Sequence, residues 1–240
     1  MTLPAVPVGV LADRDSTITA LEVSFTTRVA SFRNPLYATA QVCLPCPPPS
    51  TVGGLLGAAA GGWDDVDPAM RFAMAFTAAG EGTDLETFHP LDARGRATQP
   101  IPRDREFLSD IRLTLWLLDD IELWLSRLRR PVWPLRLGRS QDLVGIDMAT
   151  VELRAVPGRQ RAAVVPATTS TFGSLLQLPT AISRDRSRTR WGRYRFRPAR
   201  RDTATLAGPL LSDGLSTADG QGVVLLPPTH PDHAEAPEIT

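Results

Sequence analysis

Residues 47–57 read Pro-Pro-Pro-Ser-Thr-Val-Gly-Gly-Leu-Leu-Gly, which places a rigid loop directly before a helix. The prolines cannot continue a helix, whereas Ser50 is a residue type that caps one. The sequence therefore predicts a short helix over Thr51–Ala60, with Ser50 as its N-cap, which the Gly61-Gly62 pair ends.

Two adjacent glycines, Gly53 and Gly54, lie in the first turn of this helix, where each costs roughly 1 kcal/mol of helix stability. A residue without a side chain is useful there if something approaches the backbone closely. Free N–H groups and the positive end of the helix dipole attract anions, so a phosphate is one such partner. Tight packing of the helix on a sheet explains the same glycines, and both interpretations stay open.

Outward from this helix, alternating apolar residues predict strands on either side of it. Leu21–Val29 is a half-buried strand, and further strands are predicted at 70–79, 111–117 and 132–137. A second helix, 121–130, is predicted between the last two strands, with Asp119 or Asp120 as its cap. The order is strand, helix, strand, strand, helix, strand. We therefore predict an α+β fold with the ferredoxin-like (RRM-related) βαββαβ pattern.

A long polar insertion, residues 86–109, separates the second and third strands. It carries four arginines around Pro100 and Pro102: Arg94, Arg96, Arg103 and Arg105. Its length and composition predict a protruding loop or hairpin. A basic arm of this kind suits a strand of nucleic acid, and a disordered loop is the alternative.

The Leu-Gly-Arg-Ser-Gln stretch, residues 137–141, leaves the predicted fourth strand through Gly138. This turn places Arg139 and Gln141 where they can contact a phosphate or a base edge. An ordinary surface turn accounts for the same residues.

The C-terminal part contains an Arg-rich segment, residues 183–201, with nine arginines. Arg193, Arg195 and Arg197 alternate with Tyr194 and Phe196, which predicts a strand with an arginine face and an aromatic face. Such interleaving is typical of a nucleic-acid surface, although an edge strand protected by charge has the same pattern. The preceding stretches 151–156 and 162–165 indicate short strands, joined in a hairpin across Pro157-Gly158, and 202–240 resembles a loosely packed tail.

The formal net charge of zero conceals a separation of charge along the chain. All 26 basic residues are arginines, and all lie within residues 1–201, which carry a net charge of +6. Residues 202–240 carry six acids and a net charge of −6. An arginine-bearing body is compatible with nucleic-acid binding because guanidinium groups match phosphate oxygens.

Catalytic, metal and cofactor patterns are weak. Cys43 and Cys46 have no second cysteine pair to complete a zinc site, so we expect two small semi-buried residues. No phosphate loop or GxGxxG element is present, and Asp64, Asp65 and Asp67 suit a solvated turn. We expect no catalytic residues, no metal and no cofactor. Without a secretory signal or a membrane span, we expect a cytoplasmic protein.

Two motifs carry a resemblance to a known family. Ser31-Phe32-Arg33-Asn34-Pro35 after the first strand, followed by residues 47–57, closely resembles the N-terminal signature of the CRISPR-associated Cas-five family of the RAMP superfamily. The Leu-Gly-Arg-Ser turn at 137–140 is similar to the family's second motif. The resemblance covers residues 20–145 well and the remainder loosely.

The resemblance implies a ferredoxin-like domain with a β-hairpin thumb. It also implies a subunit of the type I effector complex Cascade that holds the 5′ handle of the crRNA and contacts the backbone and large subunits. We accordingly expect an N-terminal extension (1–19), a RAMP domain (20–145) with its thumb at about 86–109, a smaller β-rich region (146–201) and an acidic tail (202–240). The RNA-binding residues that we predict are Phe32, Arg33, Asn34, Tyr37, Ser50, Thr51, Gly53, Gly54, Gly138, Arg139, Ser140 and Gln141.

Two other functions remain open at this point. One member subtype of the family cleaves precursor RNA with a cluster of Tyr, His and Lys type, and this chain offers Tyr37 and His89 but no lysine. We therefore expect a non-catalytic subunit, with a metal-independent endoribonuclease as the alternative. A stand-alone RRM-like RNA-binding protein is the second alternative.

Overall fold

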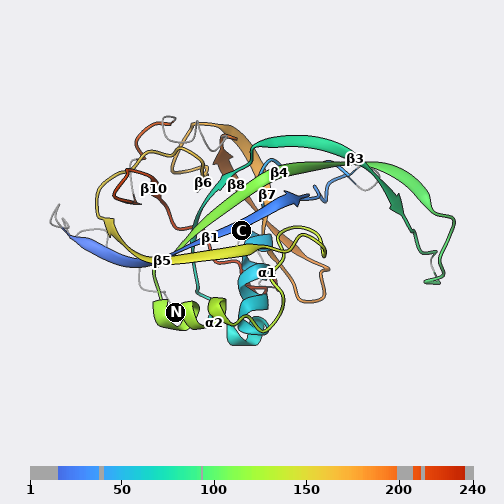
Figure 1. Cartoon of the computed structure of the whole chain (residues 1–240), viewed down its shortest axis with the longest axis horizontal. Coiled ribbons are helices and arrows are strands. Elements are labelled where there is room, and N and C mark those ends of the chain that lie inside the picture. The colour runs from blue at the N-terminus through green and yellow to red at the C-terminus, as the bar shows by residue number, and fades with distance from the viewer. Residues whose placement is uncertain (1–15, 38–40, 93, 199–207, 212–213, 236–240) are drawn as a thin grey trace.

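The computed structural model describes residues 16–37, 41–92, 94–198, 208–211 and 214–235. The described chain forms a ten-stranded sheet with α-helices on one side of its central strands (Figure 1). The strands are β1 (Thr17–Ala30), β2 (Ala73–Thr77), β3 (Gly80–Phe88), β4 (Ile101–Leu117), β5 (Gly145–Arg154), β6 (Ala163–Pro166), β7 (Ser174–Ile182), β8 (Thr189–Phe196), β9 (Leu215–Ser216) and β10 (Gly222–Val223). The helices are α1 (Pro49–Ala60), the 3₁₀ turn η1 (Trp63–Asp65), α2 (Ile121–Arg129) and α3 (Asp232–Glu235).

The centre of the sheet is β1, which pairs antiparallel with β4 on one side and β5 on the other. Its alternating residues Leu21, Val23 and Phe25 are fully buried, as the period of two predicts. They pack with apolar side chains of α1 and α2, including Leu56 and Leu128, in one large core. The predicted first strand is therefore confirmed.

The sheet order through the centre is β5-β1-β4-β2, with α1 between β1 and β2 along the chain and α2 between β4 and β5. The predicted fourth strand, 132–137, is wrong: the fourth strand of this set is β5. Proline at 131 and 134 removes two amide donors. The amides of Val132 and Trp133 instead bond to carbonyls of Ala59 and Ala58 at the end of α1, both at 3.2 Å.

Helix α1 begins earlier than expected. Its N-cap residue is Pro48 rather than Ser50, and no side chain caps the helix. Pro49 is the first residue of the helix. An amide at this position would have no acceptor within the helix, so proline loses no hydrogen bond there. The C-terminus agrees with the prediction, since Gly61 has φ +108° and its N–H bonds to the carbonyl of Gly57 at 3.0 Å.

The insertion between the second and third predicted strands forms an antiparallel hairpin of β3 with the first half of β4. Pairing runs from Gly80 with Ser109 to Phe88 with Ile101. Figure 1 shows this hairpin reaching beyond the rest of the sheet at one end. A loop or hairpin was predicted over residues 86–109; a hairpin is present, and it begins at Gly80 rather than at residue 86.

The C-terminal half departs from the sequence interpretation in two ways. Strands β5 and β6 do not pair across Pro157-Gly158, because β6 lies between β2 and β8. The end of the chain is also not loosely packed in its described part: Val223, Leu226 and His230 are at most 4% exposed. Residues 202–207, 212–213 and 236–240 of the expected tail and residues 1–15 of the expected extension lie outside the described residues. No described helix has the length and apolar character to span a membrane.

Candidate nucleic-acid interface

The loop that follows β1 folds back on itself. The amide of Asn34 bonds to the carbonyl of Val42 at 2.9 Å, and the amide of Leu44 bonds to the carbonyl of Phe32 at 2.7 Å. The Asn34 side chain also accepts the amide of Leu36 at 3.1 Å, so this residue shapes the turn. Tyr37, just beyond, is 50% exposed and can offer a stacking face.

Phe32 does not offer such a face. It is 3% exposed, and its ring meets the ring of Phe76 edge to face, with centroids 5.7 Å apart. Phe32 is one of the predicted RNA-binding residues, and the burial of its ring in the core contradicts that prediction for its side chain. Arg33, its neighbour, is exposed.

The turn at residues 138–142 packs directly against this loop. Gly138 has φ +101°, and a Cβ built there would lie 2.8 Å from the carbonyl oxygen of Ser31. Only glycine allows both the left-handed conformation and this approach. The 31–35 part of the first motif therefore lies in contact with the second motif, and the side chains of Ser140 and Gln141 are exposed.

Arg139 is engaged within the turn. Its Nε donates to one carboxylate oxygen of Asp142 at 2.8 Å and its Nη2 to the other at 3.0 Å. Asp142 is 5% exposed and also accepts the amide of Arg139 at 3.1 Å. The prediction that the Arg139 fork is open to a phosphate is wrong in this arrangement, because the fork already holds a buried carboxylate.

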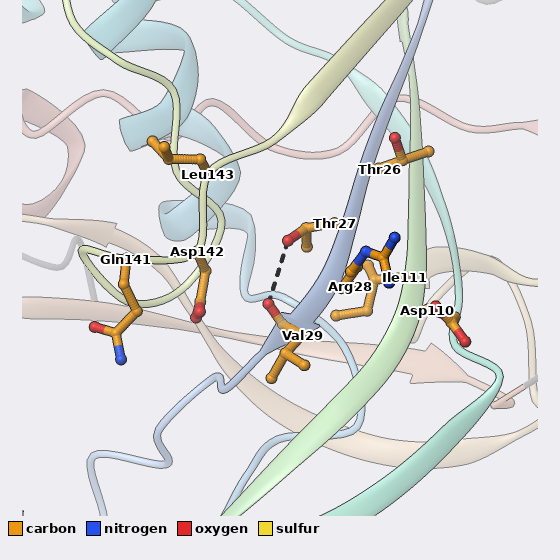
Figure 2. Close-up of a pocket in the computed structure, with 9 residues that line it drawn as sticks. All are labelled: Thr26, Thr27, Arg28, Val29, Asp110, Ile111, Gln141, Asp142 and Leu143. Carbon is orange, nitrogen blue, oxygen red and sulfur yellow. Dashed lines mark hydrogen bonds between the residues drawn. The ribbon is translucent and has the colours of Figure 1, made fainter.

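A cleft of about 510 Å³ lies at the end of β1 beside this turn (Figure 2). Figure 2 shows Gln141 and Asp142 on one side of β1 and Arg28 with Asp110 on the other. Arg28 is exposed and forms no ion pair among the described residues. The sequence analysis gave Arg28 no role; its position near the end of the predicted strand Leu21–Val29 was the available signal.

The start of α1 lies elsewhere. Gly53 is buried, and a Cβ built there would lie 2.2 Å from Oγ1 of Thr229 and 3.2 Å from the ring of Trp63. Tight packing, one of the two interpretations, therefore explains Gly53, although the partner is the C-terminal segment rather than the sheet. Gly54 is exposed, and its position has no atom within 4 Å of a built Cβ. Neither glycine lines the cleft of Figure 2.

The hairpin arginines divide into two groups. Arg105 is 5% exposed and pairs with Asp84 at 2.5 Å and with Glu86 at 2.6 Å, so its predicted contact with nucleic acid is wrong. Arg103 lies over the ring of Phe88, 5.1 Å from its centroid. Arg94 and Arg96 are exposed at the tip.

The Arg-rich strand has the predicted two faces. Tyr194 and Phe196 are each 1% exposed, and Arg193 and Arg197 are exposed. Arg195 is directed back to the protein, where its Nη1 donates to the carbonyl of Gly173 at 3.1 Å. Arg193 and Arg197 are therefore the members of this predicted surface that remain outward.

Cys43 is semi-buried, as expected, whereas Cys46 is more deeply buried than expected. Cys46 is fully buried, and the Sγ of Cys43 accepts the amide of Phe32 at 3.2 Å. Burial raises the pKa of both thiols, so neither is disposed to act as a thiolate at neutral pH.

The family model described as CRISPR-associated protein (Cas_Cas5) matches residues 20–205. The chain belongs to this Cas5 family. Its fold is similar to a chain of a "CRISPR RNA-guided surveillance complex", with a TM-score of 0.53, 16% identity, and coverage of 79% of this chain and 94% of the other. A chain of the "Type III-B Cmr-beta bound to cognate target RNA and AMPPnP" has a TM-score of 0.50, 9% identity, and coverage of 73% and 84%. No curated protein sequence matches this Cas5 chain.

Proposed function

We propose that this Cas5 chain is a non-catalytic subunit of a type I CRISPR effector complex, Cascade, in the cytoplasm, and that it binds and caps the 5′ handle of the crRNA. The observation that carries the proposal is the contact between the two family motifs, Gly138 against Ser31, beside an open cleft. Family membership supports a CRISPR effector subunit, and this contact supports a shared binding surface. Such a subunit serves antiviral defence or other RNA-guided DNA targeting.

We also propose that the core is a ferredoxin-like domain. The order β5-β1-β4-β2, the antiparallel pairing, and the two intervening helices support this assignment. In this arrangement the end of β1 and the connection that leads into β5 lie at the same edge of the sheet. That edge carries the cleft shown in Figure 2.

The handle surface, in this proposal, consists of the exposed side chains around that cleft. Arg28 and Arg33 supply charge, Tyr37 supplies a ring for a base, and Gln141 supplies an amide for a base edge. Arg139 acts indirectly, since its pair with Asp142 holds the turn in shape. The chain contains no lysine, a residue type that the cluster of the cleaving subtype includes.

The β3–β4 hairpin is the proposed contact with the backbone subunit. Its outer part exposes several large apolar side chains: Leu85, Phe88, Leu91 and Ile101. Exposed apolar residues gathered on one protruding element are typical of a protein–protein contact. The large subunit is the other proposed neighbour.

Handle RNA binding by single variants tests the proposed surface. We expect Arg28→Ala and Gln141→Ala each to weaken binding by about 1–3 kcal/mol, because each removes a phosphate or base contact. Arg154→Ala is the matched control, since Arg154 is exposed on β5 and does not line the cleft. The measurement is fluorescence anisotropy with a repeat-derived 5′ handle. Equal affinities for Arg28→Ala, Gln141→Ala and Arg154→Ala would contradict the handle surface.

The same protein–RNA mixtures, incubated in EDTA and resolved on a gel, test the absence of catalysis. We expect the RNA to remain intact. Single-site cleavage that Tyr37→Phe abolishes would identify an endoribonuclease instead.

A further inference from the structure

A cleft of about 330 Å³ lies on the face of the central sheet that is opposite to the helices. Its floor includes Arg112 and Thr114 of β4, whereas the alternate residues Leu113 and Leu115 are buried in the core that α1 and α2 cover. The segment that follows β9 forms one wall. The cleft shares no residue with the one in Figure 2, and none of its residues is among the predicted RNA-binding residues.

Two arginines flank a threonine across this floor. Thr77 of β2 pairs in register with Arg112 of β4 on one side. On the other side of β2, the amide of Phe76 bonds to the carbonyl of Ala162 at 3.0 Å. The same antiparallel register brings the preceding residue, Arg161, beside Thr77. Three side chains that donate hydrogen bonds therefore lie in one row across the sheet.

Arg161 is held in place but is incompletely bonded. Its side chain is 12% exposed, and its Nη1 donates to the carboxylate of Asp219 at 2.7 Å. Its Nη2 donates to the backbone carbonyl of the same residue. Its Nε is buried and has no hydrogen-bond partner among the described residues. A fixed guanidinium group therefore has one buried N–H donor left for a ligand.

The hydroxyl of Thr77 is a second buried group without a partner in the described part of the chain. Buried polar atoms generally form a hydrogen bond, and an exception is often explained by an absent water, ion or ligand. Here two such atoms belong to neighbouring side chains that line one cleft. Because an arginine N–H donates and a hydroxyl can also donate, one acceptor group satisfies both.

Arg112 adds a positive charge at the same place. Its Nη1 donates to Oγ of Ser24 at 2.8 Å, which holds the side chain along the sheet. Arg112 is exposed and forms no ion pair with a described residue. Asp219 balances the charge of Arg161, so the charge of Arg112 is the one that remains for an anion.

Two carboxylates also line the cleft and restrict the kind of anion that fits. Asp219 lies in the wall, and Glu22 lies farther along the floor, opposite Trp116, whose indole N–H donates to it at 2.8 Å. A chain of phosphates, as in a nucleic acid, would be repelled by these acids in a confined space. A small ligand with one anionic group avoids this repulsion, because that group can lie on the arginine side and a donor can face Glu22.

We propose that this cleft binds a small molecule through one oxyanion, a carboxylate or a phosphate. The oxyanion accepts hydrogen bonds from Arg112, from the Thr77 hydroxyl and from Nε of Arg161. The volume of about 330 Å³ is at the small end of the range of about 300–1,000 Å³ for ligand pockets. The site goes beyond the proposed RNA-binding function and does not depend on it.

Thr77→Val tests the site because it has different effects with and without the anion. The free variant should melt no lower than wild type, because it removes a buried hydroxyl that has no partner. Its affinity for the anion should fall roughly three- to ten-fold, as for one lost hydrogen bond. Thr83→Val is the matched control, since Thr83 is exposed on β3 and does not line the cleft.

The probes are sodium acetate and sodium phosphate, titrated separately at neutral pH and constant ionic strength. The melting temperature at each concentration gives an apparent Kd, because a ligand that binds only the folded chain stabilises it. Phosphate also stabilises proteins without a specific site, so the readout is the difference between variants in the same solution.

Arg112→Gln gives a second readout with its own control. We expect it to bind the effective anion at least about ten-fold more weakly than wild type, because it loses a charge-assisted contact. Arg154→Gln should bind as wild type does, since Arg154 is exposed on β5 and does not line the cleft. The anion that distinguishes wild type from both cleft variants, acetate or phosphate, identifies the oxyanion of the ligand.

Equal responses of wild type, Thr77→Val and Arg112→Gln to both anions would overturn the proposal. A uridine homopolymer is the third probe. Weaker homopolymer binding by Arg112→Gln, with no difference for acetate or phosphate, would also overturn it and would assign the row of donors to nucleic acid. The handle surface is tested with other residues, Arg28 and Gln141, so either proposal can fail alone.

Discussion

Replacing residues 87–102 of the hairpin with Asn-Gly should abolish co-purification of the backbone subunit while the chain stays folded. The exchange joins Glu86 to Arg103, which already face each other in the hairpin register. It keeps Arg105 with Asp84 and Glu86, so no buried charge loses its partner. It removes Phe88, Leu91 and Ile101, the apolar side chains that we propose for the contact.

The expected loss of assembly is large, at least about 100-fold in affinity, because several clustered apolar contacts disappear together. Thermal melting should change by only a few degrees, since the removed segment lies beyond the core strands. A matched control exchanges only Arg94 and Arg96 for Gln, which keeps the hairpin and its apolar residues. Full assembly of the shortened chain would contradict the proposed contact.

Alanine at two adjacent glycines should have opposite effects on stability. Gly54→Ala should stabilise the protein by about 0.5–1 kcal/mol, because the exposed site is open and alanine favours a helix. Gly53→Ala should instead destabilise it by about 1–3 kcal/mol, because the new Cβ would lie 2.2 Å from Oγ1 and 2.8 Å from Cβ of Thr229. Rotation of the Thr229 hydroxyl cannot remove the second contact.

Chemical denaturation of the two variants and the wild type measures this difference. The double variant Gly53→Ala/Thr229→Gly should lose less stability than the sum of the single changes, because the clash is then absent. Equal stabilisation by Gly53→Ala and Gly54→Ala would show that the C-terminal segment does not pack on α1 as described.

Local patterns were enough to predict the elements whose residues carry their own periodicity. The alternation in Leu21–Val29 and the glycines that end α1 are of this kind. The fourth strand was misplaced because Val132 and Leu135 have an apolar pattern like that of a strand, whereas their segment contacts the end of α1 and the core. Such a choice depends on a tertiary contact rather than on local propensity.

The candidate site was predictable in its location but less so in its individual contacts. The two motifs do meet at Gly138, which has a left-handed conformation and lies against the carbonyl of Ser31. The roles of Phe32 and Arg139 could not be derived, since burial of the ring and the carboxylate of Asp142 depend on the folded chain.

The RNA that accompanies the chain tests the central claim most directly. Affinity purification of the tagged chain from cells that express its CRISPR array and partner subunits, followed by sequencing of the bound RNA, reports both identity and end position. We expect crRNAs of many spacers that share one uniform, repeat-derived 5′ end, and we expect the Arg28→Ala/Gln141→Ala chain to recover much less of this RNA. Recovery of diverse cellular RNAs without a common 5′ end would contradict the assignment and favour a stand-alone RNA-binding protein.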